Sequence, residues 1–324
     1  IDEFSLLTIL LMLSLSDLFI PSTKQEFRKV ISVLSNVDEP LDSNENSEQE
    51  EVIDSNSENE KIENLIHSIL SKHDNKEYHS SLLKAAQGNV TNYINYGGDS
   101  PIHSPTNRSA LLSSNAKLLG FLLSSKFNSS ELDPVLTALI VQMSPLDSMR
   151  ISAIAKFIGI TASFNPESAV NFVKANINMI ITNQDNKLKF WKKKEKPTLE
   201  PVSCTLAIGE ILRYSPISFN DFQSIVGAFN TRFIESKEVP NWAKMKTIEA
   251  IINRNTSDPN FTVPNAKLYS TRCSLVVQES ADSGTFISAV DALFAICTNN
   301  DSNIERPEII VGNTLKFVEK GFKP

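Results

Sequence analysis

The sequence predicts an all-α protein made of stacked antiparallel helical hairpins, and three observations favour this fold class. Glycine is scarce, with 10 of 324 residues, whereas α/β nucleotide-binding folds and β-sandwiches need it for tight turns. Apolar residues recur at spacings of three and four, and no strand-like alternation or βαβ rhythm is present. Several prolines stand where a helix is expected to begin, a position that tolerates the missing N–H: Pro134, Pro166, Pro240, Pro264 and Pro307.

The first predicted domain is an N-terminal helical pair, residues 1–36, with helices over 5–20 and 23–36. Its opening run, IDEFSLLTILLMLSLSDLFIP, begins with acidic residues and is followed by no small-residue cleavage site, unlike a secretion signal. The run is shorter than the ~20 residues of a membrane span, and Asp17 interrupts it. We therefore expect a buried helix here.

Residues 37–60 are predicted to be an acidic, disordered linker. The stretch 38–60 holds ten acids and no base, and it is poor in apolar residues. The rest of the chain has 28 acids and 31 bases, so it is only weakly basic. Strong nucleic-acid-binding domains are usually more basic than this.

Serines in this linker and in a later loop stand in contexts typical of kinase substrates. Three have glutamate three residues on, and two precede proline. Phosphate there would add charge to polar segments; the alternative is that the segments are ordinary polar linkers. The predicted phosphorylation sites are Ser47, Ser55, Ser57, Ser100 and Ser104.

The next predicted domain, residues 61–108, contains amphipathic helices over about 60–73 and 76–88. A turn-rich loop, GGDSPIHSPTNR, closes it. From 109 to 324 the pattern becomes regular, with helices of 12–18 residues and short breaks. The helices expected there cover 109–125, 131–143, 149–160, 166–182, 202–214, 220–235, 240–254, 264–280, 284–298 and 306–320.

Helix pairs in this second half begin near residues 148, 202, 240 and 283. The first step is the longest because a basic loop, 184–201, is inserted there. The other steps approach the ~40–47 residues of two-helix solenoid repeats. Such pairs bury their apolar faces on one another, since one hairpin cannot cover its own.

These alternating amphipathic helices, proline-opened starts and the step of about 40 residues resemble the HEAT/armadillo superfamily over roughly 109–324. The superfamily comprises scaffolds, transport factors, chaperone cofactors and regulatory subunits. The resemblance thus implies an α-solenoid that binds other proteins, without saying which ones.

The sequence carries little that points to catalysis. The four histidines all fall between His67 and His103, and neither GxxxxGK[ST] nor GxGxxG occurs. We therefore expect no enzymatic activity, no cofactor and no metal. Cys204, Cys273 and Cys297 lie in apolar helical contexts, which favours reduced thiols and a cytoplasmic or nuclear location over secretion.

The basic loop is the strongest candidate for an anionic partner. Six lysines surround an aromatic pair in NKLKFWKKKEKPTLEP, and clustered lysines attract phosphates or carboxylates in a salt-dependent manner. An acidic protein, nucleic acid, a membrane surface or import signal, and a merely solvated loop all stay open. The predicted binding residues are Lys187, Lys189, Trp191, Lys192, Lys193, Lys194 and Lys196.

The function expected from sequence is a scaffold or adaptor subunit that holds an extended peptide or helix of a partner within a larger complex. The alternative is a helical-repeat protein that binds nucleic acid through residues 187–196. Arginine and aromatic side chains near helix ends are the expected partner contacts, because such residues carry much interface energy, although Trp242 also fits a core position. These contacts are Arg213, Tyr214, Arg232, Trp242, Lys246 and Arg254.

Overall fold

The computed structural model is all-α throughout the residues that it describes, and no strand occurs among them. The prediction of an all-α fold is therefore confirmed for this part of the chain. The described residues are 2–38, 55–72, 79–88, 105–124, 129–143, 148–185, 199–233, 236–254, 263, 265–298 and 312.

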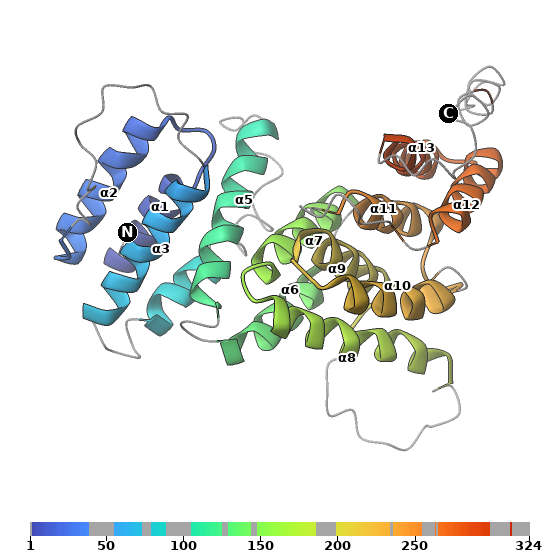
Figure 1. Ribbon diagram of the computed structural model, residues 1–324, viewed down its shortest axis with the longest axis horizontal. Coiled ribbons are helices and arrows are strands. Elements are labelled where there is room, and N and C mark those ends of the chain that lie inside the picture. Colours follow the sequence, from blue (N-terminus) through green and yellow to red (C-terminus); the bar gives the residue numbers. More distant parts are fainter. Residues whose placement is uncertain are drawn as a thin grey trace. The chain divides into compact units, whose positions relative to one another are not determined.

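The chain divides into two compact units, Ile1–Asn128 and Ser129–Pro324. The helix α5 (Pro105–Leu122), which the sequence assigned to the second half, belongs to the first unit (Figure 1). Its buried leucines join the first core because α5 packs against the first helix of the chain. The predicted domain bounds stay predictions.

The first unit is built around an apolar N-terminal helix, which packs on α2 and α5, while α2 also contacts α3. Asp2 begins it: its carboxylate accepts a hydrogen bond of 2.9 Å from Ser5 N. Leu7 and Leu11 are buried but Leu6 is exposed, so the helix is buried on one face. The helices are α1 (Glu3–Ser14), α2 (Pro21–Ser35), α3 (Ser55–Lys72), 79–88 and α5.

The helix α3 begins earlier than predicted. Residues 55–60 are helical, although the sequence placed them in the disordered linker. The amphipathic apolar face predicted for 60–73 continues this helix toward Lys72. None of the helices in the described part of the chain is long and apolar enough to cross a membrane.

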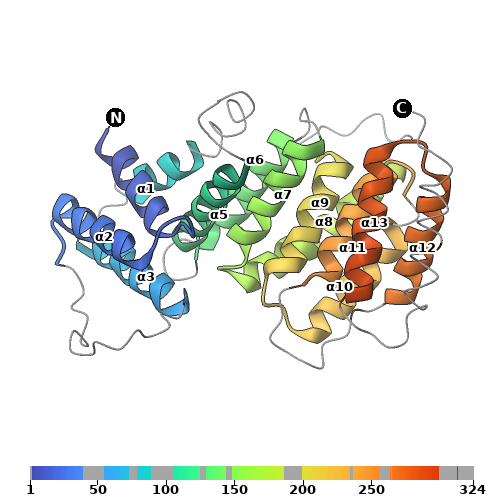
Figure 2. The same ribbon diagram turned by 90° about the horizontal axis from the view of Figure 1, so that it is seen from above.

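The second unit contains a row of four helices that pack one on the next: α7 on α9, α9 on α11, and α11 on α13 (Figure 2). The remaining helices pack behind this row, α8 against α9 and α10, and α12 against α13. The helices are η1 (Ser129–Glu131), α6 (Leu132–Met143), α7 (Ser148–Ala162), α8 (Pro166–Asp185), α9 (Pro201–Tyr214), α10 (Phe219–Phe233), α11 (Asn241–Ile252), α12 (Ala266–Glu279) and α13 (Ser283–Thr298).

The helix starts follow local sequence signals. Asn165 accepts a hydrogen bond from Ser168 N at the start of α8, as expected from Asn165-Pro166. The helix α10 begins at Phe219, one residue before the predicted start at 220. Ser218 accepts a hydrogen bond from Asp221 N, and its hydroxyl donates back to the Asp221 carboxylate at 2.8 Å.

Two glycines bring neighbouring helices of the row into close contact. A Cβ at Gly159 of α7 would lie 2.5 Å from the backbone oxygen of Glu210 in α9. A Cβ at Gly209 of α9 would lie 2.7 Å from the Thr247 methyl group in α11. Real Cβ atoms do not approach other atoms this closely, so each contact requires glycine. Glycine in the middle of a helix lowers helix stability by ~1 kcal/mol relative to alanine, and the close packing offsets that cost.

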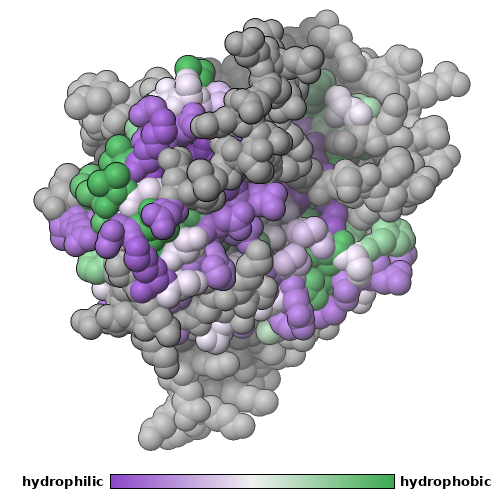
Figure 3. Space-filling view, turned by 60° about the vertical axis from the view of Figure 1, so that its left-hand side comes forward, coloured by the Kyte–Doolittle hydropathy of each residue, from purple (hydrophilic) through white to green (hydrophobic). Residues whose placement is uncertain are grey.

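Most large apolar side chains of both units are buried, but a number are exposed on helix surfaces. On the face that it shows, the space-filling view has small apolar groups among polar ones (Figure 3). Exposed apolar residues scattered singly are normal, so only those that share one helix face deserve functional interpretation. The exposed ones are Leu6, Leu18, Ile20, Val30, Val33, Leu34, Val141, Phe219, Leu268, Leu275, Ile287 and Phe294.

The glycine contacts give a first prediction. Gly159→Ala should lower the free energy of unfolding by about 2–3 kcal/mol, because α7 must move away from the α9 backbone to make room. Gly227→Ala is the matched control: its Cβ meets nothing within 4 Å, and alanine should add about 0.5–1 kcal/mol of helix propensity. Urea denaturation followed by circular dichroism measures both. Equal effects of the two substitutions would contradict the close packing.

Candidate functional site

A polar hollow opens where α7, α9 and α11 meet, within the second unit. Its volume is about 250 Å³, slightly below the ~300–1,000 Å³ of typical small-molecule pockets. The lining residues are Ser152, Ala153, Ala155 and Lys156 from α7, Leu206, Glu210 and Arg213 from α9, and Lys246 and Glu249 from α11.

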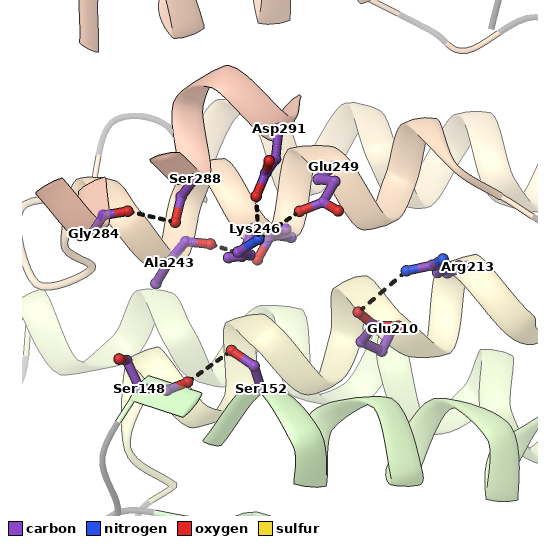
Figure 4. A network of polar contacts seen from close by, with 11 residues as sticks. Ser148, Ser152, Glu210, Arg213, Ala243, Lys246, Glu249, Gly284, Ser288 and Asp291 are labelled. Atoms are coloured by element: carbon purple, nitrogen blue, oxygen red, sulfur yellow. Dashed lines mark hydrogen bonds and ion pairs between the residues drawn. The ribbon is translucent and has the colours of Figure 1, made fainter. Parts of the chain in front are cut away.

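An ion-pair cluster lies at one edge of the hollow and joins α11 to α13. Lys246 Nζ donates to Glu249 Oε2 at 3.0 Å and to Asp291 Oδ2 at 2.9 Å, and Figure 4 shows the lysine between the two carboxylates. Burial opposes the charge of Lys246, but the hydrogen bonds to Asp291 and Glu249 outweigh it and raise the pKa of the amine. The cluster therefore keeps its lysine charged and carries one excess negative charge.

Glu210 is the most unusual group in the hollow. Its Oε1 lies 3.8 Å from Arg213 Nη1, a loose ion pair (Figure 4). Its Oε2 is fully covered, and no described residue donates a hydrogen bond to it. The side chain is 16% exposed, yet burial raises the pKa of Glu210 to about 7, against the opposing effect of Arg213 and Lys156.

The close packing at Gly159 accounts for this burial. The glycine lets α7 lie directly against the backbone of Glu210, so the carboxylate is enclosed at the base of the hollow and loses hydration. A carboxylate that is partly unpaired and dehydrated is costly to ionise. At neutral pH the hollow therefore holds Glu210 in both protonation states, beside the cations Lys156, Arg213 and Lys246.

The structure brings together two of the predicted partner contacts. Arg213 and Lys246, which come from different helices, both line the hollow. Tyr214 lies under the Arg213 guanidinium, 5.2 Å from the ring centroid, and is partly exposed, as is Trp242. The side chain of Arg232 lies outside the described residues.

The Arg254 guanidinium makes contacts within its own chain, and its predicted role as a partner contact stays a prediction. It donates to Leu212 O at 3.0 Å and to Ile217 O at 2.6 Å. It also lies over the Phe222 ring, 4.5 Å from the centroid. Arg254 therefore ties the end of α11 to the turn between α9 and α10.

Glu210 is absent from the residues predicted from sequence, although a signal was present. The helix α9, PVSCTLAIGEILRY, is mostly apolar, and its charged residues are Glu210 and Arg213, which are three residues apart. An acid inside an otherwise apolar helix must be buried with a partner or become neutral. The contact between Glu210 and Gly159 of α7 depends on tertiary packing, which the sequence alone does not specify.

Several predicted sites lie outside the described residues. These are the basic loop, with Lys187, Lys189, Trp191, Lys192, Lys193, Lys194 and Lys196, and the serines Ser47, Ser100 and Ser104. Ser55 and Ser57 lie in the first turns of α3. Binding of an anionic partner by the loop and phosphorylation of these serines stay predictions.

Within the described ranges, no group of three or more His, Cys, Asp or Glu side chains is placed to hold a metal ion. Cys204 and Cys273 are buried and free. Burial raises the pKa of each thiol to about 12, which makes both unreactive as nucleophiles. Cys297 is partly exposed.

Comparison with known proteins identifies no relative. No family model matches the chain, and no match is found among curated proteins or among solved structures. The resemblance to HEAT/armadillo proteins therefore rests on the sequence pattern alone.

The raised pKa of Glu210 gives a second prediction. Between pH 4.5 and about 7 the folded chain binds a proton that the unfolded chain has lost, so the Glu210 contribution to stability falls as pH rises. Glu210→Gln removes this penalty. It should raise the free energy of unfolding by up to about 3 kcal/mol at pH 8 relative to its effect at pH 4, as measured by urea denaturation at both pH values.

Glu249→Gln is the matched control, because its carboxylate accepts from Lys246. Losing that charge should cost about 1 kcal/mol or less at pH 8, the scale of a partly exposed ion pair. If Glu210→Gln has the same effect at pH 4 and at pH 8, Glu210 is not the strained carboxylate described above.

Proposed function

We propose that the chain is a non-enzymatic scaffold or adaptor subunit whose second unit is a short α-solenoid of stacked antiparallel hairpins, similar to HEAT/armadillo proteins. The regular starts of the row helices support this architecture: α7 at Ser148, α9 at Pro201, α11 at Asn241 and α13 at Ser283. The predicted starts, near 148, 202, 240 and 283, agree within one or two residues. The row α7, α9, α11 and α13 then forms one face of the solenoid.

The hollow between α7, α9 and α11 is the observation that carries the proposal. Three successive helices each contribute at least one charged side chain to it: Lys156, Glu210 and Lys246 are examples. A surface of this kind recognises a partner by complementary charge and by side-chain shape, and both favour protein ligands over metabolites at this volume. A partner segment that runs across the row inserts a side chain here.

The two buried cysteines of the second unit support binding in place of catalysis. Burial raises the pKa of Cys204 and of Cys273 to about 12, so neither thiol is a ready nucleophile. The described histidines, His67 and His79, belong to the first unit, where the His67 ring contacts the Ser71 hydroxyl at 3.2 Å. A carboxylate of raised pKa is common at functional sites. In this hollow it makes binding dependent on pH, because ionisation of Glu210 changes the charge that the partner meets.

A filled hollow tests the proposal. Ala153 lines the hollow and is partly exposed, so Ala153→Arg occupies the space without removing an ion pair. Ala175→Arg, at an exposed position of α8, is the matched control. Each variant is tagged as the full chain and purified from its native cells. We expect the amount of at least one copurified partner to fall at least tenfold with Ala153→Arg and to stay at the wild-type level with Ala175→Arg.

Quantitative mass spectrometry of the copurified proteins measures this difference, and circular dichroism confirms that both variants fold. An unchanged partner set with Ala153→Arg would show that the hollow is not the contact surface.

A further inference from the structure

One face of α13 carries two large apolar side chains that are exposed to solvent. Ile287 is 55% exposed and Phe294 is 69% exposed. They lie seven residues apart, which is two turns, so they point to the same side of the helix. Single exposed apolar residues are ordinary, but a pair in line on one helix forms a strip.

The strip is interrupted by a carboxylate. Asp291 follows Ile287 by four residues and precedes Phe294 by three, so it belongs to the same side of the helix. Its side chain accepts from Lys246 on one side and is 43% exposed. The order along the strip is therefore apolar, acidic, apolar.

The charge near the strip is negative. Lys246 is shared between Glu249 and Asp291, so this cluster keeps an excess of one negative charge. The helix α13 contains no lysine or arginine. Asp282, just before it, is a further acid, whose carboxylate accepts from Thr285 N at 2.7 Å. A ligand complementary to this surface has two apolar groups and a cation between them.

We infer that the strip Ile287–Asp291–Phe294 is the docking site for an amphipathic helix of a protein partner, in which a lysine or arginine lies between two apolar side chains. This inference rests on the proposed scaffold function and names the chemistry of the partner. The apolar residues of the partner helix cover Ile287 and Phe294, and its cation pairs with Asp291. Apolar contact supplies affinity, and the charge fixes register and orientation.

A helical peptide library tests this inference directly. The probe is a phage-displayed library of helical peptides with randomised outward positions, selected against the full chain. Enriched peptides should carry a basic residue between two apolar residues at spacings of three and four. Their Kd, measured by fluorescence anisotropy with synthetic copies, should rise at least tenfold with Phe294→Ser and about fivefold with Asp291→Asn, which keeps an acceptor for Lys246.

Val141→Ser is the matched control, because Val141 is a single exposed apolar residue of α6, 44% exposed, and it should leave the Kd unchanged. The inference is overturned if no peptide is enriched, if the enriched peptides are acidic, or if Phe294→Ser leaves binding unchanged. It is also overturned if sedimentation velocity shows a dimer that Phe294→Ser dissociates, since a second copy then occupies the strip. Peptide binding that appears only after residues 299–324 are removed overturns it as well, because the chain itself then covers the strip.

The Ala153→Arg variant distinguishes a failure of the strip inference from a failure of the proposed function. If only the strip is wrong, selected peptides ignore Phe294→Ser while Ala153→Arg still removes the native partner. If only the hollow is wrong, Ala153→Arg retains the native partner while peptide binding still depends on Phe294 and Asp291.

Discussion

The close approach of α7 to α9 and of α9 to α11 is the constraint on which the second unit depends. Gly159 and Gly209 admit the neighbouring helix where any side chain would collide with Glu210 or Thr247. Close packing sets which turns of successive helices meet, because interiors tolerate little change of volume. It therefore decides that Glu210 lies beside Lys156 and near Lys246, and so it creates the polar hollow.

The same contact explains why the hollow contains a strained acid. A carboxylate pressed against a neighbouring helix loses water, and one loose ion pair to Arg213 replaces only part of that hydration. The dehydrated Glu210 carboxylate therefore lowers the stability of the fold. In the Lys246 cluster, by contrast, the amine donates hydrogen bonds to both carboxylates. Destabilised polar groups of this kind are typical of surfaces that function requires.

Sequence reasoning recovered the helices of the second unit up to residue 298 because their signals are local, and the helix expected at 306–320 lies outside the described residues. Apolar spacing, Asn165 as a cap and Pro240 before α11 each act within one or two turns. Which core α5 joins depends on distant helices, so local signals do not specify it. Arg213 and Lys246 were predicted as contacts from residue type alone. Glu210 and the α13 strip could be identified only from the packed structure, because the contact between Gly159 of α7 and Glu210 of α9 is not specified by the local sequence.

Hydrogen exchange of the full chain, measured by mass spectrometry, tests most directly whether the row is one cooperative body held at its glycine contacts. Gly209→Ala should speed exchange in α7, α9 and α11 together and leave α1 and α2 unchanged, because the Thr247 contact couples successive helices. Faster exchange confined to the turn around residue 209, with α7 and α11 as protected as in the wild type, would contradict it.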